Sequence, residues 1–343
     1  MIIKSLQRLK SSTSIQSLRN NVREIISHLE SEGDFITFDD GVQKIPRDYL
    51  NRELEQIAES RTLERALYYI ERLERGLREV RTSGINDINL NRWKEYDDII
   101  IDSLWVLDKR DTTGVHSADY WGNFIPQIPQ QMIKRYTKKG EWVLDCFVGN
   151  GTTLIESQRL GRNGIGIELL EDVASRARKN ISAESNRNKM VSEVIIGDSK
   201  IVDYPLMLSK YGIDTVQLLI MHPPYFDIIK FSDDPRDLSN AESVDDFLNQ
   251  MGEVVEKASS ILDMGRYLVL VIGDKYTKGE WIPLGFLTMQ KVLERGFLLK
   301  SIIVKNFDHT AGKRKQKELW RYRALAGGFY LFKHEYIFVF RKK

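Results

Sequence analysis

From about Trp142 onward, short apolar runs alternate with longer helical stretches, and this alternation restricts the fold more than any other feature of the sequence. Runs with the length and composition of buried strands occupy residues 142–145, 164–167, 193–196, 216–221 and 267–272. Stretches that suit helices lie at 152–160, 170–180 and 244–262. Strands that alternate with helices predict a mostly parallel sheet with helices on both faces.

Two further strand-like runs close the chain, at 300–305 and 335–340, with a long basic loop between them. No helix is strongly signalled in that loop, so we expect the two runs to pair antiparallel. The predicted fold is therefore α/β, with a mostly parallel seven-stranded sheet that ends in an antiparallel strand pair. Ordinary dinucleotide-binding folds lack such an ending.

The composition excludes several classes of protein. The chain has one cysteine, Cys146, so neither an intrachain disulfide framework nor a multi-cysteine zinc site is available, and we expect no metal. No apolar run approaches the ~20 residues that cross a bilayer, and the start of the chain lacks the pattern of a secretory signal. We expect a soluble, cytoplasmic protein. Its net charge of only +2 means that any surface for a polyanion must be local.

The segment 143–154, Val-Leu-Asp-Cys-Phe-Val-Gly-Asn-Gly-Thr-Thr-Leu, joins the first predicted strand to the first predicted helix. Gly149 and Gly151 permit a tight turn and a close approach of the backbone to a ligand. A phosphate-binding P-loop would need lysine after its last glycine, but Thr152 follows Gly151. A nicotinamide fingerprint would need a third glycine where Leu154 stands. A pocket for S-adenosylmethionine is the interpretation that remains.

This glycine segment closely resembles the FxGxG motif of amino-directed DNA methyltransferases, which often has the form LDPFxGSGTT. Phe147, Gly149 and Gly151 match the motif, whereas Cys146 and Asn150 stand where the family usually has Pro and Ser. The resemblance covers roughly residues 105–343. It implies a Rossmann-like methyltransferase fold with S-adenosylmethionine as the cofactor.

Three acidic residues lie at or just after the ends of predicted strands, where this cofactor would need them. Glu168 ends the second strand, about twenty residues after the glycine loop, and its carboxylate could accept both ribose hydroxyls. Asp198 follows the third strand and could accept a hydrogen bond from the adenine amino group. By resemblance to the family, Asp145 lies near the methionine amino group. Each acid alone could be a helix cap or a surface charge, but their successive positions favour a binding role.

Residues 221–226 read Met-His-Pro-Pro-Tyr-Phe directly after the fourth strand. Consecutive prolines stiffen the backbone and remove ladder donors, so their simplest role is to end a strand. Beside the glycine loop, however, His222, Pro223, Pro224 and Tyr225 resemble the catalytic (Asp/Asn/Ser)-Pro-Pro-(Tyr/Phe) motif of the same family. The resemblance implies that the His222 side chain and the Pro223 carbonyl accept from the target amino group, while Tyr225 stacks on a base extruded from the duplex.

His222 departs from the family pattern, which supplies an oxygen acceptor. A neutral imidazole can accept through one nitrogen and a protonated one cannot, so we expect activity to fall as the pH drops through the histidine titration. Methylation at carbon 5 of cytosine needs a cysteine that follows proline, and Cys146 lies in the glycine loop instead. Adenine N6 and cytosine N4 remain as targets, and the sequence does not separate them.

Two flanking segments have ambiguous roles. Residues 117–133 resemble the family element that packs over the methionine end of the cofactor, with Phe124, Pro126 and Pro129 as its wall, but an ordinary loop before a helix is an equal alternative. A basic insertion at about 308–330 suits contacts to phosphates and bases, although a charged run is usually a solvated face. The residues assigned to DNA contact are Lys313, Arg314, Lys315, Lys317, Trp320, Arg321 and Arg323. The loop 226–240 could close over the extruded base.

The first 95 residues are highly charged, and we expect a helical extension there, followed by the catalytic domain over 96–343. Apolar residues recur at helical spacing between 51 and 81, at Leu54, Ile57, Leu63, Leu67, Ile70, Leu73 and Leu77. This pattern predicts an amphipathic helix packed on its own domain. A dimer-forming or DNA-facing element stays open as the alternative.

The function implied by the resemblance is site-specific methylation of an amino nitrogen in double-stranded DNA, for which a cognate restriction endonuclease is a further conceivable partner. An RNA amino methyltransferase would share the same pocket. A non-catalytic nucleic-acid-binding subunit is a rival from another class, because of His222, and a nicotinamide oxidoreductase ranks behind both. The sequence does not fix the recognition sequence or the oligomeric state.

Overall fold

The computed structural model describes residues 2–37, 44–116, 122–306 and 317–343. The chain divides into two compact units, Met1–Ile99 and Ile100–Lys343. Within the described residues, no helix combines the length and the apolar character needed to cross a membrane.

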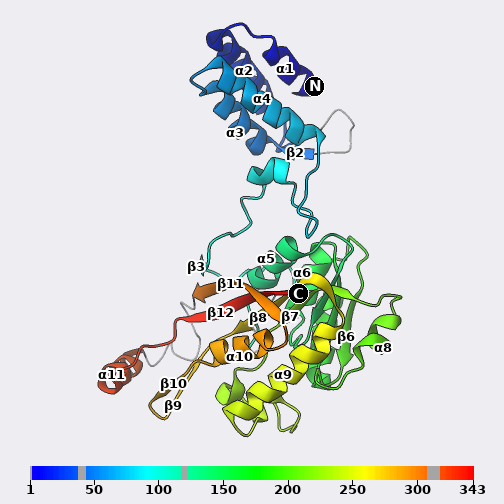
Figure 1. Ribbon diagram of the computed structural model, residues 1–343, viewed down its shortest axis with the longest axis vertical. Coiled ribbons are helices and arrows are strands. Elements are labelled where there is room, and N and C mark those ends of the chain that lie inside the picture. Colours follow the sequence, from blue (N-terminus) through cyan, green and yellow to red (C-terminus); the bar gives the residue numbers. More distant parts are fainter. Residues whose placement is uncertain (1, 38–43, 117–121, 307–316) are drawn as a thin grey trace. The chain divides into compact units, whose positions relative to one another are not determined.

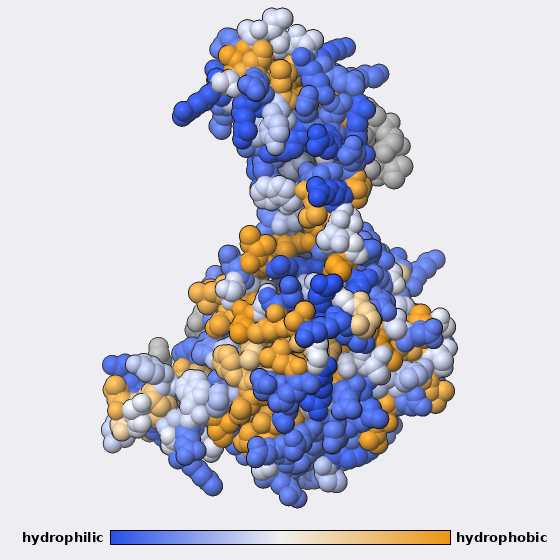
Figure 2. Space-filling view, in the orientation of Figure 1, coloured by the Kyte–Doolittle hydropathy of each residue, from blue (hydrophilic) through white to orange (hydrophobic). Residues whose placement is uncertain are grey.

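Unit 1 is a small helical body with a two-stranded hairpin (Figure 1). Its elements are α1 (Ile2–Lys10), α2 (Ile15–Glu30), β1 (Phe35–Thr37), β2 (Lys44–Pro46), α3 (Arg47–Ala58), α4 (Leu63–Arg78) and the 3-10 helix η1 (Leu90–Glu95). Leu6, Leu18, Leu54 and Ile70 belong to the core that the four α-helices share. Figure 2 shows a mostly hydrophilic outer face on this unit, as expected when amphipathic helices turn their apolar stripes inward.

The single helix predicted across 51–81 is wrong, because the structure has two helices there. Helix α3 ends at Ala58 and α4 begins at Leu63. Thr62 caps the second helix, since its side-chain oxygen accepts the Arg65 N–H at 3.2 Å. A threonine cap stabilises a new helix start, and the apolar spacing continued across the break and hid it. Within both helices the apolar stripe is buried as predicted, with Ile57 and Ile70 fully enclosed.

Unit 2 contains an eight-stranded sheet in the order β3-β11-β12-β8-β7-β4-β5-β6 (Figure 1). Its strands are β3 (Leu104–Trp105), β4 (Trp142–Asp145), β5 (Asn163–Glu168), β6 (Ser192–Ile196), β7 (Val216–Met221), β8 (Leu262–Ile272), β11 (Phe297–Asn306) and β12 (His334–Lys342). The strands from β8 to β6 are parallel, and β12 is antiparallel to both β8 and β11. The α/β architecture and the antiparallel closing pair are confirmed. The eighth strand, β3, has two residues and was too short to leave a pattern in the sequence.

Helices cover both faces of this sheet, because alternate side chains of each strand point to opposite faces. Leu219 and Leu268 lie in a core with α8, α9 and α10, whereas Leu218 and Val269 lie in the opposite core with α5. The helices are α5 (Gln127–Tyr136), α6 (Thr152–Arg159), α7 (Glu171–Ala183), α8 (Tyr204–Ser209), α9 (Val244–Ser260) and α10 (Leu284–Leu293), with the 3-10 turns η2 (Phe226–Ile228) and η3 (Leu238–Asn240). In Figure 1, α5 and α6 lie on one side of the sheet and α9 and α10 on the other.

The segment between the two closing strands contains a helix, so the prediction of a long loop is wrong there. Helix α11 (Lys317–Gly327) has the sequence KELWRYRALAG, in which Lys, Glu, Leu, Arg and Ala favour helix. The chain after this helix packs on the hairpin of β9 (Lys275–Thr277) and β10 (Glu280–Ile282). Phe329 stacks on Tyr276 with ring centroids 4.2 Å apart.

Candidate active site

A cleft of about 1500 Å³ lies at the carboxyl ends of the parallel strands of unit 2. Parallel strands end at one edge of the sheet, so loops that are far apart in the sequence meet there. The predicted site residues that line the cleft are Phe124, Phe147, Gly149, Glu168, Asp198, His222, Pro223, Pro224, Tyr225 and Trp320. The structure therefore brings the glycine turn and the diproline corner to one cleft.

The glycine turn has left-handed backbone at both glycines. Gly149 has a φ of 50° and Gly151 a φ of 88°, backbone conformations that residues with a Cβ rarely adopt. Gly151 immediately precedes α6, and a Cβ there would lie 3.2 Å from Ile181 of α7. Gly149 lines the cleft, whereas Gly151 is absent from its lining. Gly149 thus brings backbone to the ligand side, and Gly151 allows the first helix to start.

Asp145 is fully buried beneath the glycine turn and does not line the cleft. One carboxylate oxygen accepts the Phe147 N–H at 2.9 Å, and the other accepts the Thr153 hydroxyl at 2.5 Å. Burial raises the pKa of this carboxyl to about 6. In this arrangement Asp145 holds the shape of the turn.

Glu168 and Asp198 present carboxylates to the cleft from the ends of β5 and β6. Glu168 Oε2 accepts the Gly149 N–H at 3.0 Å, and Oε1 accepts the Leu170 N–H at 3.1 Å. Burial raises the pKa of Glu168 above its ordinary value. Asp198 Oδ1 accepts the Lys200 N–H at 2.9 Å. Each carboxylate oxygen has a second lone pair, so both acids can still accept from a ligand.

The diproline corner places an imidazole and a phenol side by side. His222 Nε2 lies 3.1 Å from the Tyr225 hydroxyl, and the His222 ring stacks on Phe124 with centroids 4.9 Å apart. Burial lowers the pKa of His222 to about 4, so the ring is neutral near pH 7. The Tyr225 ring packs against Gly273, where an added Cβ would lie 2.9 Å from the ring.

Two charged residues of this site were missed in the sequence. Tyr225 donates from its hydroxyl to Glu335 Oε2 at 2.8 Å, and Lys305 Nζ lies 3.0 Å from Glu335 Oε1. Lys305 and Glu335 face each other across β11 and β12, and both line the cleft. A charged residue at the end of an otherwise apolar strand was the available signal, because such a charge is buried only when it is paired.

Arg110 is a third missed residue of the cleft lining. Its Nη1 donates to the carbonyls of Asn123 at 3.2 Å and Phe124 at 3.0 Å. Its Nε and Nη2 are buried and have no hydrogen-bond partner among the described residues. Burial lowers the pKa of this guanidinium below its ordinary value. Nothing in the charged stretch 108–111 distinguished this arginine from a solvated one.

The residues predicted to contact DNA lie on two kinds of segment. Lys313, Arg314 and Lys315 fall outside the described residues. Lys317 is the first residue of α11, which also carries Trp320, Arg321 and Arg323. Trp320 lines the cleft, and the Arg323 guanidinium lies 5.0 Å from the centre of its ring. Arg321 and Arg323 are exposed, so their charges are open to solvent.

The predicted methionine-end segment is only partly in the cleft. Ser117–Trp121 fall outside the described residues, and Phe124 lines the cleft against His222. Pro126 precedes α5, and Pro129 is buried within that helix. Neither proline lines the cleft. From this segment the cleft is lined by Gly122, Asn123, Phe124 and Ile125, next to Arg110, which is bonded to the Phe124 carbonyl.

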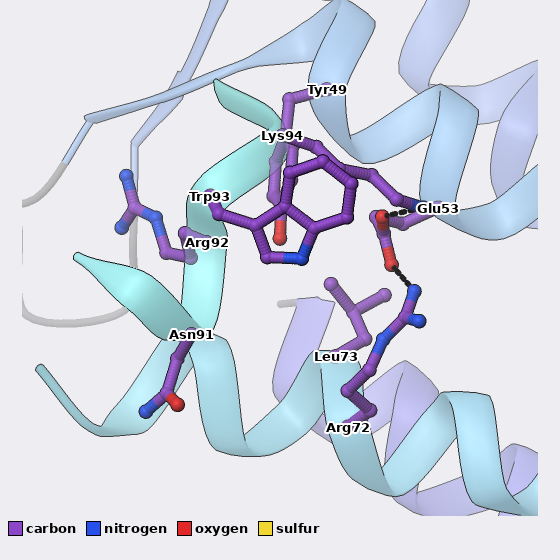
Figure 3. A pocket seen from close by; sticks show the side chains of 8 residues that line it. All are labelled: Tyr49, Glu53, Arg72, Leu73, Asn91, Arg92, Trp93 and Lys94. Atoms are coloured by element: carbon purple, nitrogen blue, oxygen red, sulfur yellow. Dashed lines mark hydrogen bonds and ion pairs between the residues drawn. The ribbon is translucent and has the colours of Figure 1, made fainter. Parts of the chain in front are cut away.

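Unit 1 contains a second, much smaller hollow, which Figure 3 shows from close by. Glu53 lies in it between two cations: Lys94 Nζ is 2.6 Å from its Oε1, and Arg72 pairs with its Oε2. Gln56 accepts from both cations as well, at 2.7 Å from Arg72 and 2.9 Å from Lys94. These charges satisfy one another, so this hollow is a structural ion-pair network that ties η1 to α3 and α4.

The strand order and the glycine turn at the carboxyl edge define a Rossmann-like methyltransferase fold. The profile of the DNA methylase family matches residues 20–179 and 216–343. The chain therefore belongs to the amino-directed (N6/N4) DNA methylase family.

Individual relatives match over shorter stretches. Type II methyltransferase M.MjaII of Methanocaldococcus jannaschii is 26% identical over 174 residues, which are 50% of this chain and 25% of that protein. Type II methyltransferase M.BglI of Bacillus subtilis is 39% identical over 77 residues, 22% of each chain. The chain thus spans about a quarter of the length of these relatives. The crystal structure of TrmN from Thermus thermophilus aligns with a TM-score of 0.41 and 17% identity, over 64% of this chain and 49% of that chain.

The cofactor of this family is S-adenosylmethionine, and the residues of the cleft fit it. Two buried guanidinium nitrogens of Arg110, which have no partner in the part of the chain that the structure describes, can bind a carboxylate such as that of the methionine part. The carboxylates of Glu168 and Asp198 can accept from hydroxyl and amino groups. Phe124 and Phe147 add apolar surface to the lining of the cleft.

Proposed function

We propose that this protein transfers a methyl group from S-adenosylmethionine to the exocyclic amino nitrogen of adenine (N6) or cytosine (N4) in DNA, on a base turned out of the duplex. The observation that carries the proposal is that one cleft is lined by Gly149, Glu168 and Asp198 on the cofactor side and by His222 and Tyr225 on the other. Such a juxtaposition is what a transfer between two bound molecules requires, because catalysis here depends on holding them in line.

The cofactor-side residues have distinct tasks in this proposal. Arg110 binds the methionine carboxylate, Glu168 accepts the ribose hydroxyls and Asp198 accepts the adenine amino group. Asp145 supports the turn from below through its bonds to Phe147 and Thr153. The cofactor, when bound, supplies a methyl group already activated on a positively charged sulfur.

The base-side residues orient the acceptor. An exocyclic amino nitrogen is a poor nucleophile because its lone pair is delocalised into the ring. The neutral His222 imidazole and the Pro223 carbonyl accept hydrogen bonds from its N–H groups and so turn the lone pair toward the methyl group. Tyr225 stacks on the extruded base. The Tyr225 hydroxyl is bonded to Glu335 and its ring packs on Gly273, so this stacking surface is held in place.

Double-stranded DNA is the proposed substrate, and the basic segment 308–330 is its proposed contact. Arg321 and Arg323 on α11 are exposed and can reach phosphates. Trp320, on the same helix, lines the cleft. Phosphate contacts fix the position of a duplex, and base contacts give specificity. A cognate restriction endonuclease would be a partner of the same system.

The direct test is methyl transfer from labelled cofactor to duplex DNA of mixed sequence, followed by mass spectrometry of the nucleosides. We expect N6-methyladenine or N4-methylcytosine, and a loss of label with His222→Ala. Transfer RNA is the parallel substrate, and label in that RNA alone would replace DNA by RNA in the proposal. Tight cofactor binding without transfer to any nucleic acid would overturn the enzymatic function and favour a binding subunit.

A further inference from the structure

A chain of hydrogen bonds runs from the diproline corner to a buried ion pair. His222 Nε2 lies 3.1 Å from the Tyr225 hydroxyl, which donates to Glu335 Oε2 at 2.8 Å. Glu335 Oε1 is paired with Lys305 Nζ at 3.0 Å, and both of these side chains are less than 10% exposed. All four residues line the cleft, yet the family motif accounts only for His222 and Tyr225.

The direction of these hydrogen bonds follows from counting protons. A carboxylate can only accept, so the single hydroxyl proton of Tyr225 goes to Glu335. The Tyr225 oxygen then meets His222 as an acceptor, and the Nε2 of His222 must carry the proton that it donates. In a neutral imidazole the other nitrogen, Nδ1, is then a pure acceptor. Nδ1 has no hydrogen-bond partner among the described residues.

We propose that Glu335, held by Lys305, acts through Tyr225 as a positioning residue that keeps His222 in the Nε2–H tautomer and so makes Nδ1 the acceptor for the target amino group. This inference rests on the proposed function. It explains how histidine can stand where the family has Asp, Asn or Ser, because the fixed tautomer offers one acceptor in a set place. An imidazole that is free to change tautomer would present a donor N–H for part of the time.

The proton balance of the transfer is simple in this arrangement. The bond between the amino nitrogen and the methyl carbon forms while the bond between that carbon and sulfur breaks, and sulfur keeps the electron pair. The amino nitrogen then carries an extra positive charge and loses one proton to Nδ1 of His222. The resulting imidazolium keeps its Nε2–H bond to Tyr225, whose hydroxyl remains bonded to the Glu335 carboxylate. The negative charge of Glu335 stabilises this product as the carboxylate of a catalytic triad stabilises its histidine.

The tautomer can be observed directly by nitrogen-15 NMR of the full chain with labelled histidine. The sequence has five histidines, and loss of one pair of signals in His222→Asn assigns the pair that belongs to His222. In the unmodified protein we expect Nε2 to be the protonated nitrogen and Nδ1 the bare one. Glu335→Gln and Tyr225→Phe should both abolish this preference. An unchanged tautomer in both variants overturns the proposal.

Kinetics provide the second readout. Glu335→Gln should lower kcat about 10- to 100-fold, which is less than the roughly 100- to 10,000-fold that a general acid or base contributes, because Glu335 acts only through Tyr225. The KM for DNA and the Kd for S-adenosylhomocysteine should stay within about twofold, since neither ligand is held by Glu335. Tyr225→Phe keeps the ring and leaves the Glu335–Lys305 pair intact, so it tests the link even if Glu335→Gln folds poorly. The double variant should lose no more than Tyr225→Phe alone, because both act through one chain.

A matched control exists on the same strand. His334 Nε2 lies 3.0 Å from the Tyr336 hydroxyl, which donates to Asp274 at 3.2 Å, and Tyr336 does not line the cleft. Tyr336→Phe therefore removes a bond of the same kind away from the site, and we expect kcat and the His222 signals to be unchanged. If the protein transfers no methyl group to any DNA, the proposed function is refuted. The NMR experiment on the His222 tautomer does not depend on transfer, so it still decides this inference. Transfer at the normal rate by Glu335→Gln would refute the inference alone.

Discussion

The Tyr225 hydroxyl lies 2.8 Å from the Glu335 carboxylate, although 110 residues separate them in the chain. The reversed direction of β12 makes this contact possible. Parallel strands end at the edge where the cleft lies, and an antiparallel strand among them begins at that edge. Glu335 is the second residue of β12, and its partner Lys305 is the penultimate residue of β11. The antiparallel strand therefore supplies the active site with residues from its start, while its neighbours supply them from their ends.

The titration of His222 should not limit methyl transfer in the usual range of pH. Burial lowers the pKa of this group to about 4, so the imidazole is neutral and able to accept throughout pH 5.5–8. We expect no loss of kcat from His222 in that range, and a fall only as the pH approaches 4. This replaces the fall near pH 6.5 that an ordinary histidine would give.

The measurement is a pH profile of single-turnover transfer, with folding followed alongside by circular dichroism. The unfolded chain binds a proton at His222 below about pH 6.5 and the folded chain does so only near 4. The contribution of His222, measured as the difference in the free energy of unfolding between the unmodified protein and His222→Asn, should therefore fall as the pH drops between those values. His222→Asn removes the titration and should have no such acid limb. A limb near 6.5 that disappears in His222→Asn would contradict the lowered pKa.

Arg110 should contribute to cofactor affinity through the carboxylate. Two of its guanidinium nitrogens are buried without partners among the described residues. A charge-assisted hydrogen bond of about 2 kcal/mol corresponds to about a 30-fold change in Kd. Calorimetry should show this loss for S-adenosylhomocysteine with Arg110→Gln. Decarboxylated S-adenosylhomocysteine, which lacks only the carboxylate, should bind both proteins equally.

A second arginine of the cleft serves as the comparison. Arg236 lines the cleft, but its guanidinium is already paired with Asp234 at 2.6 Å. Arg236→Gln should leave the Kd of S-adenosylhomocysteine within about twofold. An equal loss for the two analogues in Arg110→Gln would instead assign Arg110 to the structure of the loop through Asn123 and Phe124.

The sheet could be predicted from the sequence because its strands are buried and bounded by turn residues. The strands at 142–145 and 216–221 match β4 and β7 residue for residue. The elements that were missed have weaker signals. Strand β3 is only two residues long, and the basic residues of α11 made its segment resemble a charged loop. The break between α3 and α4 was hidden because apolar spacing continues across it.

The site was predictable where function fixes a local motif. The glycine turn and the diproline corner are each a short continuous run of residues, and residues of both line the cleft. Glu335, Lys305 and Arg110 are single residues whose roles come from tertiary contacts. A charge at the end of an apolar strand marks Lys305 and Glu335 only weakly, and nothing in the local sequence marks Arg110. Asp145 differs from these residues, because the motif does draw attention to it. Its carboxylate points inward and accepts from Phe147 and Thr153, so it supports the turn.

The basic segment should control the salt dependence of DNA binding. Charge reversal at Lys313, Arg314 and Lys315 should weaken binding to duplex DNA and flatten the plot of log K against log salt by about 0.9 for each phosphate that the protein no longer neutralises. Charge reversal at Lys138 and Lys139, which precede β4 at the opposite edge of the sheet, is the control and should leave the slope unchanged. Equal slopes for all three proteins in a fluorescence titration would refute the assignment.

Glu53 should stabilise unit 1. It is 3% exposed and holds Arg72 and Lys94 together. Glu53→Gln removes the charge between two partly buried cations and should cost about 2 kcal/mol. Hydrogen exchange followed by mass spectrometry should show faster exchange in peptides from 47–95 and no change in peptides from 142–168. Glu55→Gln, an exposed change on the same helix, should leave both regions unchanged.

Gly273 should be required for the rate and dispensable for cofactor binding. It follows β8, and an added Cβ would lie 2.9 Å from the Tyr225 ring, closer than carbon atoms pack. Gly273→Ala must therefore displace that ring, and with it the hydroxyl that joins His222 to Glu335. A displacement of about 1 Å at a reacting group can cost up to 100-fold in rate. We expect kcat to fall at least tenfold by that argument, with the Kd of S-adenosylhomocysteine unchanged. Gly33→Ala has no atom within 4 Å of its new Cβ and serves as the control. Normal transfer by Gly273→Ala would show that the position of the Tyr225 ring does not set the rate.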